Sequence, residues 1–192
     1  MRRSISQKLI LQIMPVVLVI FVALTVISIL MAGAAEKKLA YEAAFQMAEN
    51  FSNDFNGQMS ANLAVSRNMS YMMAGYQNVD RENALRALKN QVEQDEGILG
   101  AYVGYEPNAF DNRDAEFVDQ PGHDGTGRFI PYWNRLTGQL TLDPLLDYET
   151  SDYYLIPKNT LTDSIIEPYM YEGVLMTSFI SPIVDRSGKF LG

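Results

Sequence analysis

The hydrophobic pattern begins with an uninterrupted apolar segment near the N-terminus. Residues 9–35 carry no charged side chain, and they follow Arg2, Arg3 and Lys8. A helix of about 20 apolar residues crosses the hydrocarbon core of a bilayer while satisfying its own backbone hydrogen bonds. Basic residues on this side of a span favour a cytoplasmic N-terminus. The pattern therefore predicts a cytoplasmic tail over residues 1–8 and a transmembrane helix over residues 9–35, with the remainder exported.

A cleaved signal peptide is the alternative interpretation of this segment. Ala32, Gly33 and Ala34 have the small-residue spacing of a cleavage site. The apolar part of a signal peptide runs about 7–15 residues, however, and this segment is much longer. We therefore favour an anchored span, and both interpretations export the rest of the chain.

Residues 36–76 contain no proline and repeat apolar side chains at helical spacing. Met47, Phe51 and Phe55 are examples, since they recur every four positions and share one helical face. At 1.5 Å per residue, a helix of this length extends roughly 60 Å. We predict that it continues the span away from the membrane. We also predict a homodimer through this helix, although the apolar spacing is not a regular heptad.

The period of the pattern changes after residue 76. Asp80 is a favourable N-cap, and Leu85, Leu88 and Val92 share one face of a short helix predicted over residues 81–96. Helices followed by short strands indicate an α+β fold with an antiparallel sheet. Strands are predicted over residues 100–105, 128–135, 139–142, 174–184 and from 189 onward, with a long loop over 106–127 and an irregular segment over 143–172.

Alternation along residues 128–135 assigns side chains to two faces of a strand. Pro131 has no N–H to donate, which predicts an edge strand or a bulge. The expected faces are Phe129, Pro131 and Trp133 on one side, and Arg128, Ile130 and Tyr132 on the other.

Composition and charge limit the classes of function. After the predicted span the chain has 12 basic and 23 acidic residues, and such a surface repels nucleic acid. The chain has no cysteine and a single histidine, His123, so it offers neither a disulfide framework nor a zinc site. The acids of residues 106–127 lack the spacing of a calcium loop, and no nucleophile or nucleotide motif occurs. We therefore expect no metal, no cofactor and no enzymatic activity.

Aromatic residues concentrate between positions 133 and 171, interleaved with acids such as Asp152. Aromatic faces near carboxylates suit an organic cation, because each favourable contact contributes about 0.5–2 kcal/mol. The alternative is an ordinary aromatic core, but for the whole cluster we favour a ligand pocket. The aromatic members are Trp133, Tyr148, Tyr153, Tyr154, Tyr169 and Tyr171.

Several short motifs follow one another in a fixed order along the chain. They are GRFIPYW at 127–133, DYY at 152–154, EPYMY at 167–171, SPI at 181–183 and GKFLG at 188–192. Together with the order of span, long helix, short helix and sheet, they resemble the double-Cache family of extracytoplasmic sensors. The resemblance implies a PAS-like, membrane-distal, ligand-holding module over residues 77–192. It also implies that the module is truncated at its C-terminal end.

The resemblance also implies which residues hold a ligand. Tyr153 and Tyr154 occupy the place of a Trp-Tyr pair in amino-acid-sensing members, and Tyr169 matches a pocket tyrosine. Ser151 stands where those members have an arginine for the ligand carboxylate, so Arg128 or Lys158 would have to supply the cation. The candidate ligand-binding residues are Trp133, Asp152, Tyr153, Tyr154, Tyr169, Tyr171 and Arg128.

We therefore expect the extracytoplasmic ligand-sensing part of a methyl-accepting chemotaxis receptor in the cytoplasmic membrane. Its ligand is expected to be a small polar solute that resembles an amine or an amino acid. Sensor input for a histidine kinase or a cyclic-nucleotide enzyme is one alternative. A structural module with a vestigial pocket is the other.

Overall fold

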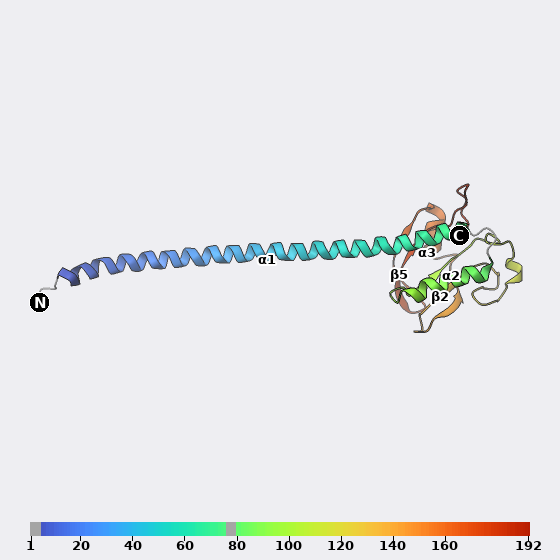
Figure 1. Cartoon of the computed structure of the whole chain (residues 1–192), viewed down its shortest axis with the longest axis horizontal. Coiled ribbons are helices and arrows are strands. Elements are labelled where there is room, and N and C mark those ends of the chain that lie inside the picture. The colour runs from blue at the N-terminus through green and yellow to red at the C-terminus, as the bar shows by residue number, and fades with distance from the viewer. Residues whose placement is uncertain (1–4, 76–79) are drawn as a thin grey trace. The chain divides into compact units, whose positions relative to one another are not determined.

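The first element of the fold is a single long helix, α1 (Ile5–Gly75), which Figure 1 draws as one unbroken ribbon. The computed structural model describes residues 5–75 and 80–192. Contacts divide the chain into two compact units, Met1–Gly57 and Gln58–Gly192, so the last turns of α1 belong to the second unit. The prediction of a long helix that runs on from the apolar segment is confirmed. Residues 76–79, which include the last predicted residue of that helix, lie outside the described residues.

The N-terminal part of α1 is long and apolar enough to cross a membrane. Its most apolar window has a mean hydropathy of 3.0, and none of that window is buried within the chain. The Thr25 hydroxyl donates a hydrogen bond to the Phe21 carbonyl, at 2.8 Å. This polar group is thereby satisfied within the helix, as a lipid environment requires.

The second helix, α2 (Arg81–Gln94), forms where the apolar stripe predicts it. Asp80 accepts a hydrogen bond from the Asn83 N–H at 2.7 Å, which satisfies one of the free donors at the helix start. Ala84, Leu88 and Val92 recur every four residues and are buried. The helix therefore packs on the module through one face.

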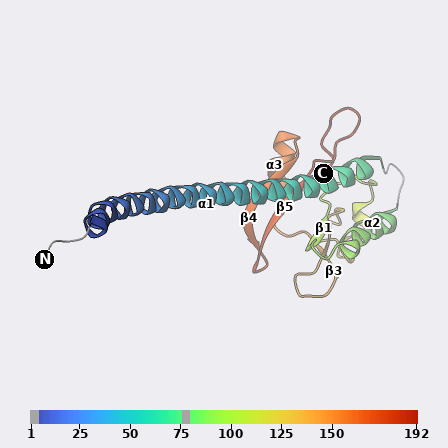
Figure 2. The same ribbon diagram turned by 60° about the vertical axis from the view of Figure 1, so that its left-hand side comes forward.

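The strands form two antiparallel sheets, which Figure 2 shows as separate ribbons. The first sheet has the order β1 (Gly100–Tyr102), β2 (Pro131–Asn134) and β3 (Thr141–Pro144), and the second pairs β4 (Ser164–Tyr171) with β5 (Val174–Ile180). A short 3-10 helix, η1 (Asp114–Glu116), lies in the loop before β2, and α3 (Asp152–Thr160) precedes β4. The prediction of mixed helix and antiparallel sheet is confirmed.

Two expectations for the C-terminal part are wrong. Residues 143–172 are not irregular, because they contain α3 and β4. The strand predicted over residues 174–184 ends at Ile180 and pairs with β4. After it, Val184 bridges Phe190, and the Leu191 N–H donates to the Ile183 carbonyl at 2.8 Å across the next turn. The turn that joins β4 to β5 has positive φ at Glu172 (46°) and Gly173 (82°). Positive φ at both central residues matches the twist of a two-residue hairpin.

The expectation that Pro131 marks an edge strand or a bulge is also wrong. β2 is the central strand of its sheet, between β1 and β3. Pro131 is the first residue of that strand, where a missing N–H is tolerated. Its carbonyl still takes part in the pairing, because it accepts a hydrogen bond from the Val103 N–H at 3.3 Å.

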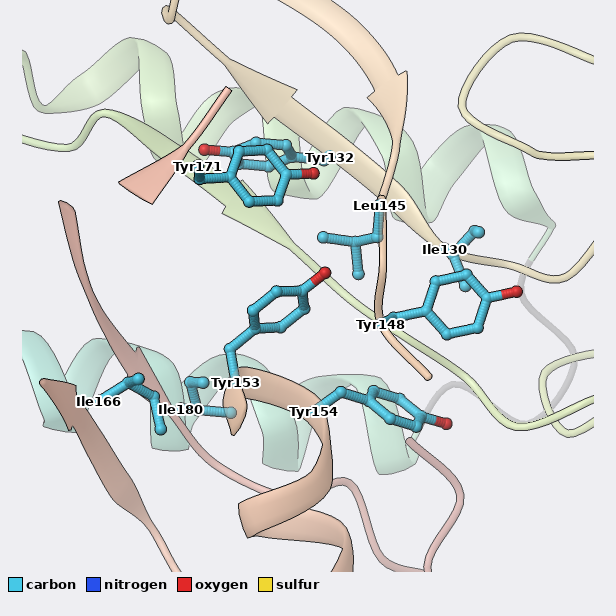
Figure 3. Close-up of a cluster of buried hydrophobic side chains, with 9 residues drawn as sticks. All are labelled: Ile130, Tyr132, Leu145, Tyr148, Tyr153, Tyr154, Ile166, Tyr171 and Ile180. Atoms are coloured by element: carbon cyan, nitrogen blue, oxygen red, sulfur yellow. The ribbon is translucent and has the colours of Figure 1, made fainter. Parts of the chain in front are cut away.

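The side chains of β2 separate two hydrophobic clusters, as the alternation predicts. Phe129 and Trp133 pack with Leu88 of α2, whereas Ile130 and Tyr132 face the other side. The second set belongs to what we call the tyrosine cluster (Figure 3). Its buried members are Ile130, Tyr132, Leu145, Tyr148, Tyr153, Tyr154, Ile166, Tyr171 and Ile180.

Candidate ligand-binding site

A cavity of about 710 Å³ lies beside the tyrosine cluster, within the second unit. Its volume falls in the range of about 300–1,000 Å³ that is usual for small-molecule sites. One wall is the last part of α1, from Gln58 to Ser70, and the others are β1, β4, β5 and α3. The lining tyrosines are Tyr102, Tyr132, Tyr153, Tyr154, Tyr169 and Tyr171.

The tyrosine rings contact one another across element boundaries. Tyr153 of α3 stacks against Tyr169 of β4, with ring centroids 5.9 Å apart and planes at 24°. The Tyr153 ring also meets the edges of Tyr102 and Tyr171, at 5.6 Å and 6.2 Å. Figure 3 shows Tyr132 and Tyr171 side by side, with Tyr153 rising from α3 towards Leu145. Four elements therefore contribute to one aromatic surface.

Hydrogen bonds fix the orientation of several of these rings. The Tyr153 hydroxyl donates to the Leu146 carbonyl, and the Leu146 N–H donates to the Tyr171 hydroxyl at 3.1 Å. The Tyr169 hydroxyl lies 2.8 Å from the Ser178 hydroxyl on β5. Rings held in this way keep their faces in place before a ligand arrives, which lowers the ordering cost of binding.

Two polar atoms at the cavity have no protein partner among the described residues. They are the Tyr102 hydroxyl and the Ser181 hydroxyl, and both atoms are buried. Burial raises the pKa of Tyr102 well above its ordinary value, and it also raises the pKa of Tyr169. Both phenols therefore stay neutral.

Charge is sparse at the cavity. Among the residues that the structure describes, Asp95 is the one charged side chain in the lining, and it is exposed. Arg128 lies nearby but outside the lining: its Nε and Nη2 donate to the Tyr105 carbonyl at 2.9 and 2.7 Å, and Nη2 also donates to the Tyr154 hydroxyl at 2.7 Å. The Lys158 ammonium pairs with Glu106 at 2.7 Å. Both cations are therefore bound to other groups.

The structure brings four of the seven candidate residues together. Tyr153, Tyr154, Tyr169 and Tyr171 line the cavity, whereas Arg128, Asp152 and Trp133 do not. These three residues are therefore not part of the ligand site that we propose. Arg128 is buried in the network just described.

Asp152 and Trp133 lie apart from the cavity for different reasons. Asp152 is exposed in the first turn of α3. Trp133 packs in the cluster on the α2 side of the sheet, with the Lys89 ammonium 5.4 Å from its ring centroid. The alternation along β2 already places Trp133 opposite Tyr132, so the pattern contained this separation.

Sequence reasoning missed two tyrosines of the cavity, Tyr102 and Tyr132. Both lie in segments predicted as strands, and the alternation along β2 placed Tyr132 on the face opposite Trp133. Tyr102 stands 31 positions before the aromatic segment 133–171, and Tyr132 directly precedes it, so neither was counted in that segment. Within residues 5–75 and 80–192, no three His, Asp or Glu side chains gather closely enough to hold a metal ion.

The comparison with protein families decides what kind of domain this is. Residues 84–192 match the family described as methyl-accepting chemotaxis protein-like, first PDC sensor domain. The chain belongs to this family. The resemblance to Cache-type sensors is thereby confirmed, and the apolar part of α1 makes this a membrane-anchored sensor domain.

Relatives of known description agree with this assignment. The methyl-accepting chemotaxis protein TlpQ of Pseudomonas aeruginosa (strain PAO1) is 33% identical over an alignment of 131 positions, which covers 58% of this chain and 18% of that protein. The solved extracellular domain of mmHK1S-Z3, a protein named as a histidine kinase, is 49% identical with a TM-score of 0.77, over 81% of this chain and 57% of that one. A solved structure named methyl-accepting chemotaxis protein X is 28% identical with a TM-score of 0.69, over 81% and 61%. The chain thus spans less than two thirds of each of these relatives.

Proposed function

We propose that this chain is the extracytoplasmic ligand-sensing part of a methyl-accepting chemotaxis receptor, and that the tyrosine cavity binds a small amine. The composition of the cavity lining is the observation that favours an amine as the ligand. The lining combines six tyrosines with Asp95 as its one charged side chain among the described residues. The family match and the similarity to TlpQ support the receptor class.

The charge of the cavity favours an amine over an amino acid. A ligand carboxylate needs a cationic partner when it leaves water, because an unpaired buried charge is costly. Arg128 and Lys158 are the nearest candidates, and both are already paired. An ammonium group also loses solvation on burial, but the tyrosine faces compensate by about 0.5–2 kcal/mol each and the Asp95 carboxylate in the lining offers an opposite charge. The acidic surface of the exported part also raises the local concentration of cations.

A homodimer is part of this proposal. Along α1 the side chains of Tyr41, Phe45 and Phe51 are 77%, 72% and 75% exposed. Large apolar side chains on one helix are unusual at a free surface in water, and a second copy of the helix would cover them. We place these side chains outside the cytoplasm, because they follow the span.

Sensor input for a histidine kinase is the second candidate function. The 49% identity to the extracellular domain of mmHK1S-Z3 favours it. Both candidates use the same sensing module, so the output domain of the native protein distinguishes them.

The test is calorimetric titration of the whole chain in lipid nanodiscs against matched pairs of compounds. Each pair holds an amine and the amino acid from which it derives: 2-phenylethylamine with phenylalanine, tyramine with tyrosine, and cadaverine with lysine. We expect at least one amine to bind and its amino acid to bind at least tenfold more weakly. A folded chain that binds no member of the panel contradicts the proposal, and so does tighter binding of the amino acids.

A further inference from the structure

An ion pair joins two walls of the cavity. Arg67 on α1 donates from Nε and Nη2 to the same oxygen, Oδ2 of Asp163, at 2.6 and 2.5 Å. Asp163 immediately precedes β4, so the contact links positions 96 residues apart. Arg67 follows Ser66 and precedes Ser70 by one turn, and both serines line the cavity. The pair therefore lies beside the cavity, where α1 approaches the start of β4.

Apolar packing holds the end of α1, where Met73 is buried in one cluster with Ala84 and Leu88, whereas the turns before it face the cavity. The cavity occupies the space between residues 58–70 of α1 and the face of β5, so packed side chains do not fill it. A second polar contact follows one turn later, where the Ser70 hydroxyl donates to the Pro182 carbonyl at 2.6 Å. A third lies beyond it, where the Tyr105 hydroxyl donates to the Met73 carbonyl at 3.1 Å. Of the three, only the pair of Arg67 and Asp163 joins two full charges.

We propose that Arg67 and Asp163 are positioning residues that set the width of the cavity and make ligand affinity depend on ionic strength. The inference rests on the proposed function of the cavity as a ligand site. A ligand that touches α1 and the β-strands binds only when the two walls are at the right distance. Its apparent affinity is then the intrinsic affinity multiplied by the fraction of molecules that have this geometry.

The size and salt dependence of the effect follow from exposure. The Arg67 side chain is 45% exposed and that of Asp163 is 24% exposed, so salt screens their attraction. Measured pairs of this kind correspond to changes of up to about fivefold in an equilibrium constant. Removing either partner should therefore weaken binding by about two- to fivefold and reduce the salt dependence to the part that comes from the acidic surface.

The experiment uses the whole chain in lipid nanodiscs and two measurements on Arg67→Gln and Asp163→Asn. The first is the affinity for 2-phenylethylamine at low and high salt. The second is the distance between spin labels on Ser60→Cys and Glu167→Cys, which the cysteine-free chain allows at two exposed positions. Lys38→Gln is the matched control, because it removes an exposed ion pair with Glu42 elsewhere on α1.

We expect both variants to broaden the spin-label distance distribution, to bind the amine two- to fivefold more weakly and to show a smaller salt dependence than the wild type. The charge swap Arg67→Asp with Asp163→Arg should restore all three properties, and Lys38→Gln should change none. An unchanged distance distribution in the single variants overturns the inference, as does a salt dependence equal to that of the wild type. A wild-type chain that binds no amine overturns the proposed function instead, and the distance measurement still decides whether the pair holds the walls.

Discussion

Single residues decide which ligand the cavity can hold. Tyr153, Tyr169 and Tyr171 have their hydroxyls bonded to neighbouring groups, and Tyr169, which is half-buried, keeps the most ring surface for a ligand, since Tyr153 and Tyr171 are 3% and 9% exposed. A ligand with an ammonium group can use this surface, since it is attracted to ring faces.

The Tyr169→Ala variant tests the ring faces. We expect it to bind the best amine of the panel about 2- to 30-fold more weakly, because it removes one face that contributes about 0.5–2 kcal/mol. Tyr169→Phe keeps the face and should stay within about threefold of the wild type. Tyr71→Ala is the control, since Tyr71 is exposed on α1 outside the cavity. Calorimetry gives all three affinities, and equal affinity in Tyr169→Ala would remove this residue from the site.

His123 makes the stability of the module depend on pH. Its ring stacks on Phe117 with centroids 5.2 Å apart, and its buried Nε2 has no partner among the described residues. Burial lowers its pKa, against the opposing effect of the Pro121 carbonyl 2.9 Å from Nδ1. The unfolded chain therefore takes up the proton first, at about pH 6.5. Stability is full above that pH and falls as the pH drops towards the lowered pKa of the folded state.

Thermal unfolding between pH 7.5 and 5.5 measures this effect. We expect the midpoint of the wild type to fall over this range, because His123 is the only histidine in the chain. His123→Phe keeps an aromatic ring against Phe117 and should show a flatter profile. Parallel profiles for the two proteins would contradict the assignment.

At the scale of elements, the helices and strands that could be predicted are those whose capping residues and apolar spacing match the way they pack in the structure. α2 has an N-cap at Asp80 and a single apolar stripe, and the structure confirms it. β4 was missed because it contains Pro168, which falls where the register with β5 shifts between Ile166 and Tyr169. A bulge accommodates a proline inside a strand. α3 was missed for a similar reason, since Pro157 stands within it.

The candidate site also has a part that the sequence predicts and a part that it does not. The dense run of tyrosines could be found from composition, and four of them line the cavity. That Arg128 is bound to the Tyr105 carbonyl could not be found, because the contact joins residues 23 positions apart on different segments. Long-range hydrogen bonds of this kind follow from the fold and leave no local pattern.

Arg81 connects α2 to the long loop before β2. Its guanidinium pairs with Asp111 at 2.8 Å and Asp114 at 2.6 Å, and Nη1 donates to the Gly127 carbonyl at 2.8 Å. Asp111 is partly buried, which by itself would raise its pKa, but the hydrogen bond and charge of Arg81 outweigh this and lower it. Arg81 and Asp114 are only 4% and 5% exposed. Each side chain is therefore the main compensation for the buried charge of the other.

Replacing Arg81 should therefore destabilise the module strongly. We expect Arg81→Ala to lower the free energy of unfolding in urea by about 3–5 kcal/mol, because it leaves a buried carboxylate without its cation. Arg113→Ala is the matched control in the same loop, since it removes an exposed pair with Glu116 and should leave the stability unchanged. Equal stability of the two variants would contradict a structural role for the buried pair.

At the scale of the whole molecule, the account depends on which side of the membrane the tyrosine module occupies. Arg2, Arg3 and Lys8 precede the apolar segment, whereas Lys37 and Lys38 follow it and the next basic residue is Arg67. This asymmetry predicts an N-terminus inside the cell and a module outside. A sensor in this orientation meets solutes before they cross the membrane.

Labelling of introduced cysteines tests the orientation, because the natural chain has none. We expect Ser187→Cys, in an exposed turn, to react with a membrane-impermeant maleimide in intact cells. Ser4→Cys should react only after the cells are opened. The reverse pattern would show that the module lies in the cytoplasm.

The central claim is that the tyrosine cavity holds the cationic group of a small amine, and a crystal structure of the whole chain with the best amine of the panel tests it most directly. The account predicts the ammonium within about 6 Å of tyrosine ring centroids in the cavity, the distance at which such contacts are attractive. Tyr169 is the ring we expect it to meet first, because it is half-buried whereas Tyr153 behind it is 3% exposed. An amine bound elsewhere on the module, with the cavity closed by its own side chains, would contradict the account.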